Sequence, residues 1–168
     1  DLLQRAGHYP PPPGAPPYMG LEMCGTIRQT GDQVCGWNVG DRVLALLSGG
    51  GYAEQVAVPA DHLIALPDDW GFARGAAVPE VFLTAFVNLF LEARLQPGET
   101  VLIHGGGSGV GTAAIQLARV SNCRVIATAG TDAKTARCQA LGAELTINYR
   151  KHDFAEAALA HFDGVDVI

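Results

Sequence analysis

A glycine-rich turn, placed between an apolar run and a helix-forming run, constrains the fold of this chain more than any other feature. Residues 101–103 are Val-Leu-Ile, a short apolar run bounded by turn residues, which is typical of a parallel strand buried on both faces. Apolar residues then recur at Ala113, Leu117 and Val120, with the i, i+4, i+7 spacing of one helix face. The sequence therefore predicts a strand, a tight turn and a helix in direct succession.

The turn itself is Gly106-Gly107-Ser108-Gly109-Val110-Gly111. Glycines permit positive φ and close approach of the backbone to a ligand, and the start of a helix offers free N–H groups. The match to G-x-G-x-x-G is imperfect, because a serine stands where the middle glycine is expected, so the interpretation depends on the residues that follow. With that context, the layout predicts a site for the pyrophosphate of a dinucleotide, lined by Gly106, Ser108, Gly109, Val110 and Gly111.

Strand and helix patterns continue to alternate after the turn. Apolar runs at Arg124–Ala129 and Leu145–Asn148 predict strands, and a fourth strand is expected to begin at Val165. Between the first two, the residues from Ala133 to Leu141 predict a helix that ends at Gly142. Such alternation with short connections predicts an α/β fold, here the first half of a doubly wound parallel sheet.

The chain before residue 80 is different, being rich in glycine, proline and short alternating runs. We expect β structure there, with strands at Gly25–Ile27, Arg42–Leu46 and Tyr52–Val58. The proline-rich segment from Tyr9 to Pro17 excludes helix and central strand, so it predicts an extended loop, either a surface connection or one wall of a substrate cleft. A helix over Glu80–Leu91, begun by the preceding proline, would join the two regions.

Charge and hydropathy argue against two classes of partner. The net charge is −6 and no cluster of Lys and Arg offsets it, so we expect no nucleic-acid surface. We also expect no membrane partner, because no apolar stretch approaches the length of a bilayer span. The four cysteines show no C-x-x-C spacing, which favours free thiols in a cytoplasmic protein. Because the chain begins without Met and stops within a predicted strand, we expect a part of a longer protein that is inactive by itself.

Together, these segments resemble the medium-chain dehydrogenase/reductase superfamily and, within it, the zinc-free quinone oxidoreductases. The resemblance implies a partial GroES-like substrate domain over residues 1–79 and a partial NADPH-binding Rossmann domain over residues 80–168. It also implies NADPH-dependent reduction of quinones or related α,β-unsaturated carbonyls by hydride transfer, and a homodimer in the full-length protein. The residues that carry it include Gly7-His8-Tyr9, Gly20-Leu21-Glu22, Val39 to Val43, Gly49 to Glu54, Leu83-Thr84-Ala85, Gly98 to Arg119 and Ile147 to Arg150.

The end of the second predicted strand bears on the choice of cofactor. An NAD site usually has Asp or Glu there, whereas this chain has Ala129-Gly130-Thr131, with Asp132 better placed as the N-cap of the next helix. A 2′-phosphate is then not repelled, and Lys134 supplies a cation for it, so NADPH is favoured over NADH. The alternative for Lys134 is an ordinary solvated helix lysine. The resemblance implies an adenosine-phosphate pocket formed by Gly130, Thr131, Lys134 and Tyr149.

The resemblance also implies roles for two residues near the nicotinamide. Tyr9 matches a tyrosine beside the nicotinamide and is our candidate catalytic residue, as a hydrogen-bond donor to the substrate; the alternative is an aromatic anchor for the proline loop. Thr84 matches a nicotinamide contact, and the alternative is a helix threonine bonded to its own backbone.

Zinc-dependent members of the superfamily carry a Gly-His-Glu element that supplies a metal ligand. Here that element is Gly20-Leu21-Glu22, and Glu80 falls where a second ligand cysteine is expected, so we predict no metal. Two alternative functions stay open at this point. One is reduction of enoyl thioesters, which uses the same turn without zinc, and the other is a noncatalytic NADPH-binding protein with a sensing or structural role.

Overall fold

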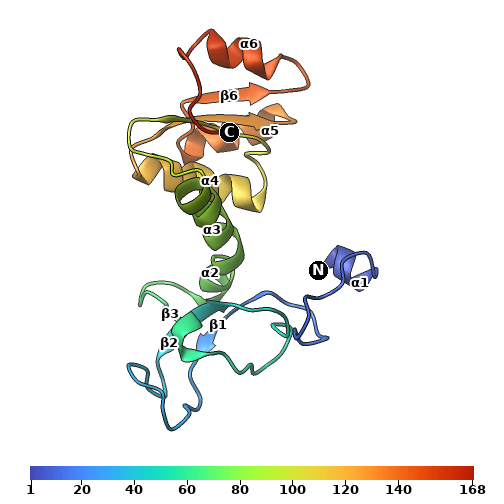
Figure 1. The fold of residues 1–168 in the computed structure, drawn as a ribbon, viewed down its shortest axis with the longest axis vertical. Helices are drawn as coiled ribbons and strands as arrows, with labels where there is room; N and C mark the ends of the chain where they lie inside the picture. The colour runs from blue at the N-terminus through green and yellow to red at the C-terminus, as the bar shows by residue number, and fades with distance from the viewer. The chain divides into compact units, whose positions relative to one another are not determined.

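The computed structural model describes residues 1–168, which divide into two compact units, Asp1–Glu80 and Val81–Ile168 (Figure 1). The first unit contains a three-stranded sheet and the second contains another. No helix has the length and apolar character that crossing a membrane requires. The α/β fold class predicted from the sequence, a small β-rich domain followed by the first half of a Rossmann sheet, is confirmed.

The first unit is built on an antiparallel sheet with the order β1-β2-β3. Gly75 brings a helix of this unit against the sheet, because a Cβ at this position would lie 2.5 Å from both Cys24 Sγ and Leu66 Cδ1. The strands are β1 (Glu22–Thr26), β2 (Arg42–Leu46) and β3 (Ile64–Ala65), and the helices are α1 (Leu2–Arg5), η1 (Ala60–His62) and α2 (Phe72–Ala76).

Two of the strand predictions for this unit need correction. Residues 52–58 form no strand, although their composition suits one. A strand requires ladder hydrogen bonds to a neighbouring strand, and these residues pair with none of β1, β2 and β3. The first strand covers Glu22–Thr26 rather than Gly25–Ile27, and residues 9–17 are free of helix and strand, as their prolines predicted.

The second unit has a parallel sheet with the order β4-β5-β6, and the bridge between Val101 and Val167 lies on the other side of β4. The chain therefore turns from one direction along the sheet to the other at β4, which is where ligands bind in doubly wound folds. The fourth strand, expected from Val165, is present only as this single bridge. The strands are β4 (Thr100–Ile103), β5 (Arg124–Ala129) and β6 (Leu145–Asn148), and the helices after them are α4 (Gly109–Val120), α5 (Asp132–Leu141) and α6 (Phe154–Leu159).

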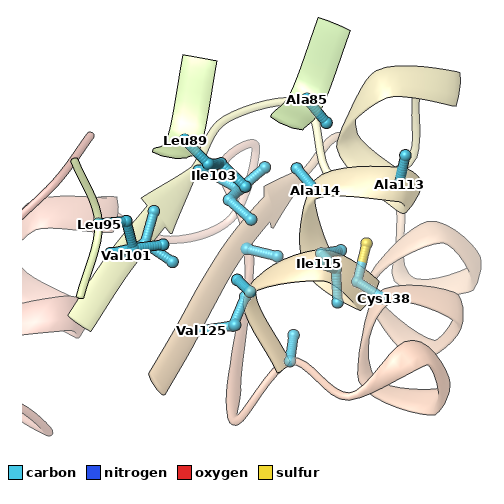
Figure 2. Packing of buried hydrophobic residues seen from close by; sticks show 13 residues of the cluster. Ala85, Leu89, Leu95, Val101, Ile103, Ala113, Ala114, Ile115, Val125 and Cys138 are labelled. Atoms are coloured by element: carbon cyan, nitrogen blue, oxygen red, sulfur yellow. The ribbon is translucent and has the colours of Figure 1, made fainter. Parts of the chain in front are cut away.

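Helices cover both faces of this sheet because its side chains alternate between them. Val101 and Ile103 pack with Ile115 of α4 on one face, as Figure 2 shows, while Leu102 between them packs on the other face with Phe162. Ile115 is fully buried. The strands of this sheet are apolar at successive positions because both of their faces are buried.

The helix predicted over residues 80–91 is present but changes its winding. It runs as an α-helix over α3 (Pro79–Phe86) and continues as a π-helix, η2 (Val87–Glu92). The Ala93 N–H bonds the Asn88 carbonyl at 3.0 Å, a five-residue spacing that α-helical periodicity does not predict. The helix at 133–141 begins one residue early, and Gly142 ends it with φ of 116°, as expected.

We predict that Ile115→Ala lowers the free energy of unfolding by about 2–5 kcal/mol, because it empties a fully enclosed site. Val120→Ala on the same helix is the control. Val120 is 75% exposed, so its change should stay within about 0.5 kcal/mol. Urea unfolding of the natural full-length protein measures both, and equal losses would contradict this description of the core.

Candidate functional site

The glycine turn between β4 and α4 is held by one hydrogen bond to β5 and by another at the start of α4. The Gly106 N–H bonds the Thr128 carbonyl at 2.8 Å, which ties the turn to β5. Ser108 is the N-cap of α4, and its Oγ accepts a hydrogen bond from the Gly111 N–H at 3.0 Å. The N–H groups of Gly109 and Val110 have no acceptor in the protein, so two donors at the start of this helix are free for an anion.

Two glycines of the turn lie in close contact with other parts of the unit, Gly111 with backbone and Gly106 with core side chains. A Cβ at Gly111 would lie 2.8 Å from the Gly106 Cα and would also collide with the Gly105 carbonyl oxygen. A Cβ at Gly106 would lie 3.0 Å from both the Ala127 Cβ and the Cys138 Sγ. The first and third glycines of the motif therefore permit the close contact of helix and sheet, and Ser108, in place of the second, caps the helix.

The end of β5 forms a second part of the site. A Cβ at Gly130 would lie 2.6 Å from the Tyr149 Oη, so the tyrosine ring lies over this glycine. Thr131 is the N-cap of α5, since its Oγ1 accepts from the Lys134 N–H at 3.3 Å. The Lys134 stem lies against the glycine turn, because a Cβ at Gly107 would be 3.1–3.2 Å from three of its carbons. The structure thus brings the turn, Lys134, Gly130 and Tyr149 to the same edge of the sheet.

The prediction that Asp132 caps this helix is wrong. Thr131 has the extended backbone of a cap, with φ −149° and ψ 154°, so Asp132 is already inside the first helical turn. Its carboxylate instead accepts from the Lys151 ammonium at 2.5 Å and from the Asn148 amide at 2.6 Å. These hydrogen bonds, the one from Lys151 foremost, lower the pKa of the Asp132 carboxyl below its ordinary value.

Tyr9 and Thr84 lie in different units, so each is described by itself. Tyr9 is 60% exposed and its hydroxyl makes no hydrogen bond. Thr84 is half-buried in α3, and its hydroxyl does not bond to its own backbone, although its carbonyl accepts from the Asn88 amide at 2.8 Å. Their roles near a nicotinamide stay predictions.

Leu21 stands where the resemblance implies a ligand histidine, and the absence of a metal stays a prediction. Leu21 has no ligand atom, and the adjacent Glu22 carboxylate accepts a hydrogen bond from the Glu80 N–H at 3.0 Å. Nowhere in the chain do three His, Cys, Asp or Glu side chains gather closely enough to hold a metal ion. The four cysteines are free, and burial raises the pKa of the Cys24 thiol.

Sequence reasoning missed two residues of the candidate site, Asn148 and Arg150. A Cβ at Gly130 would lie 3.5 Å from the Arg150 Nε, which brings this guanidinium beside Tyr149. Asn148 is buried, and it connects Asp132 to the backbone of Arg150. A basic group at residues 150–152 directly after a strand was the available signal, but charge alone does not say which side chain faces the sheet edge.

Comparisons with known proteins agree with this geometry. Two family models match, the alcohol dehydrogenase GroES-like domain over residues 1–68 and the zinc-binding dehydrogenase family over residues 109–168. The human synaptic vesicle membrane protein VAT-1 homolog-like is 42% identical over 132 residues, which are 78% of this chain and 32% of the relative.

Solved structures are similar over most of the chain. The quinone oxidoreductase of Thermus thermophilus, known also in complex with NADPH, has a TM-score of 0.80 and 37% identity over 99% of this chain and 52% of that chain. CurK enoyl reductase has a TM-score of 0.82 and 38% identity over 89% of this chain and 46% of that chain. The chain thus spans about a third of the human relative and about half of each of these solved chains.

An antiparallel β unit followed by a parallel sheet with a glycine turn defines a class of dinucleotide-fold oxidoreductases. With both family models matched, the chain belongs to the medium-chain dehydrogenase/reductase superfamily.

We predict that Gly111→Val lowers the free energy of unfolding by about 2–3 kcal/mol, because the new side chain pushes α4 off the end of β4. Gly107→Ala is the matched control. Its Cβ would meet only the flexible stem of Lys134, so the loss should be below about 1 kcal/mol. Chemical denaturation compares them, and a Gly111→Val protein as stable as the wild type would show that no close contact exists here.

Proposed function

We propose that this chain is part of an NADPH-dependent oxidoreductase that reduces quinones or related α,β-unsaturated carbonyls without zinc. In this proposal residues 1–79 belong to the substrate domain and residues 80–168 to the cofactor domain. The single observation that carries it is that free N–H groups, Lys134 and Tyr149 lie at the same edge of the sheet, where the Asp132 carboxylate is already paired.

The residues of this edge fit a dinucleotide with a 2′-phosphate. The N–H groups of Gly109 and Val110 would hold the pyrophosphate, and the Ser108 hydroxyl can donate to it because its oxygen already accepts from Gly111. Lys134 and Tyr149 would hold the 2′-phosphate beside Gly130 and Thr131. The fit favours NADPH over NADH, because the Asp132 carboxylate in the first turn of α5 is paired with Lys151.

NADPH, when bound, supplies a hydride to the acceptor. In this proposal the protein holds the acceptor carbonyl in place and polarises it with hydroxyl groups, since Leu21 has no side-chain atom that could bind a metal ion. Tyr9 is our candidate for this hydrogen bond, since its hydroxyl is exposed and has no partner. Thr84, whose hydroxyl is equally free, would contact the nicotinamide.

The similarity to Thermus thermophilus quinone oxidoreductase supports a quinone as the acceptor. The segments that carry the family resemblance are also similar to those of the p53-inducible quinone oxidoreductase. The same resemblance supports a cytoplasmic homodimer. The similarity to CurK enoyl reductase supports a second candidate function, reduction of an enoyl thioester, and the cofactor site is compatible with both.

The two acceptors can be distinguished by steady-state kinetics of the natural full-length protein with NADPH. We expect kcat/KM for a simple benzoquinone to exceed that for a short enoyl thioester by at least about ten-fold. A preference for the thioester would replace the first candidate with the second. Absence of turnover with either, together with tight NADPH binding, would indicate a noncatalytic protein.

We predict that Lys134→Ala reduces the preference for NADPH over NADH by about ten-fold, because one charge-assisted hydrogen bond to the 2′-phosphate is lost. Lys134→Arg, which keeps the charge, should retain most of the preference. Isothermal titration with both nicotinamides measures it, and an unchanged ratio in Lys134→Ala would remove the basis for assigning NADPH.

A further inference from the structure

One residue of β5, Thr128, is bonded at two points to the chain that leads from β4 into the glycine turn. Its carbonyl accepts from the Gly106 N–H at 2.8 Å, and its hydroxyl is hydrogen-bonded to Nδ1 of the His104 ring at 3.1 Å. Between these two points lies Gly105, whose φ of 66° is in the left-handed region that favours glycine. The left-handed residue just before the turn is thus held on both sides by Thr128.

The hydroxyl of Thr128 needs the histidine more than the histidine needs the hydroxyl. Thr128 is 1% exposed, and His104 is the hydrogen-bond partner of its hydroxyl. A buried hydroxyl that loses its partner destabilises the fold, because water does not replace the bond. His104 is exposed, so water can replace the bond on its side. The polar interior of β5 is therefore satisfied by a side chain from the start of the turn.

The His104 ring is also held from a second direction, by α6. The edge of one ring meets the face of the other between His104 and Phe154, with centroids 4.8 Å apart and planes at 89°. Phe154 is the first residue of α6, which Asp153 caps by accepting hydrogen bonds from two N–H groups. Neither ring belongs to a buried hydrophobic cluster of the unit, so the contact orients the imidazole without filling the core.

We propose that His104 is a positioning residue for the glycine turn. By bonding the Thr128 hydroxyl it fixes the backbone from which the Gly109 and Val110 N–H groups would meet the pyrophosphate of the cofactor. This inference rests on the proposed use of the turn as a dinucleotide site. A turn that is already fixed loses less conformational freedom when the ligand binds, so it binds the ligand more tightly. His104 acts through Thr128 and contributes equally to NADPH and NADH, because both carry the pyrophosphate.

The test compares two probes, ADP-ribose, which carries a pyrophosphate, and 5′-AMP, which does not, titrated calorimetrically into the natural full-length protein. His104→Leu should weaken ADP-ribose by about three- to ten-fold and 5′-AMP by less than about two-fold. His104→Asn should restore the affinity to within about two-fold of wild type, because its amide reaches about as far from the backbone as Nδ1.

Thr128→Val separates positioning from stability. It keeps the shape of the buried side chain and removes the need for a partner, so Tm should shift by less than about 3 °C. ADP-ribose should nevertheless bind about three- to ten-fold more weakly, as in His104→Leu, and the double variant should be no weaker than either single one. A Thr128→Val protein with wild-type affinity for ADP-ribose would overturn the proposal.

His161→Leu is the matched control, because His161 is exposed and its Nδ1 is bonded to the Ala157 carbonyl at 2.9 Å, away from the glycine turn. It should change neither affinity by more than about two-fold. A wild type that binds ADP-ribose no more tightly than 5′-AMP would overturn the proposed use of the turn itself. A wild type that prefers ADP-ribose, with His104→Leu keeping that preference, would overturn only the role of His104. Equal weakening of both probes by His104→Leu would overturn that role too.

Discussion

The close contact between the start of α4 and the end of β4 is the constraint on which the candidate site depends. Gly111 lies so near to Gly105 and Gly106 that no side chain fits between them. The contact aims the first turn of the helix along the edge of the sheet and leaves the N–H groups of Gly109 and Val110 without partners. A packing requirement of the core and an anion-binding requirement of the surface are thus met by the same glycines.

Lys134 extends this arrangement to the next helix. Its stem lies over Gly107, so α5 packs close to the glycine turn at a position where the turn has no side chain. The start of α5 is held to the turn after β6 through Asp132 and Asn148. The charges at the edge follow from this packing: a carboxylate is neutralised, while the cations at positions 134 and 150 remain without a carboxylate partner.

Most of the second unit could be predicted from the sequence, because its strands are buried on both faces and its helices carry local signals. Gly142 ended α5 as predicted, since only its left-handed backbone closes that helix easily. Predictions failed where contacts with other parts of the chain, rather than local composition, decided the structure of a segment. Residues 52–58 have the composition of a strand but pair with no neighbouring strand, and Asp132 is a residue type common at helix caps, although Thr131 occupies that position. Arg150 was missed because it lies beside Gly130, which is twenty residues earlier in the chain.

Hydrogen–deuterium exchange of the natural full-length protein, with and without saturating NADPH, tests the central claim most directly. Peptides covering residues 105–112 should exchange more slowly with either NADPH or NADH, because both carry the pyrophosphate. Peptides covering 130–134 and 149–151 should gain further protection with NADPH alone, through the 2′-phosphate. Saturating NADPH that leaves residues 105–112 unprotected would contradict the account, because the glycine turn would then not be the phosphate site.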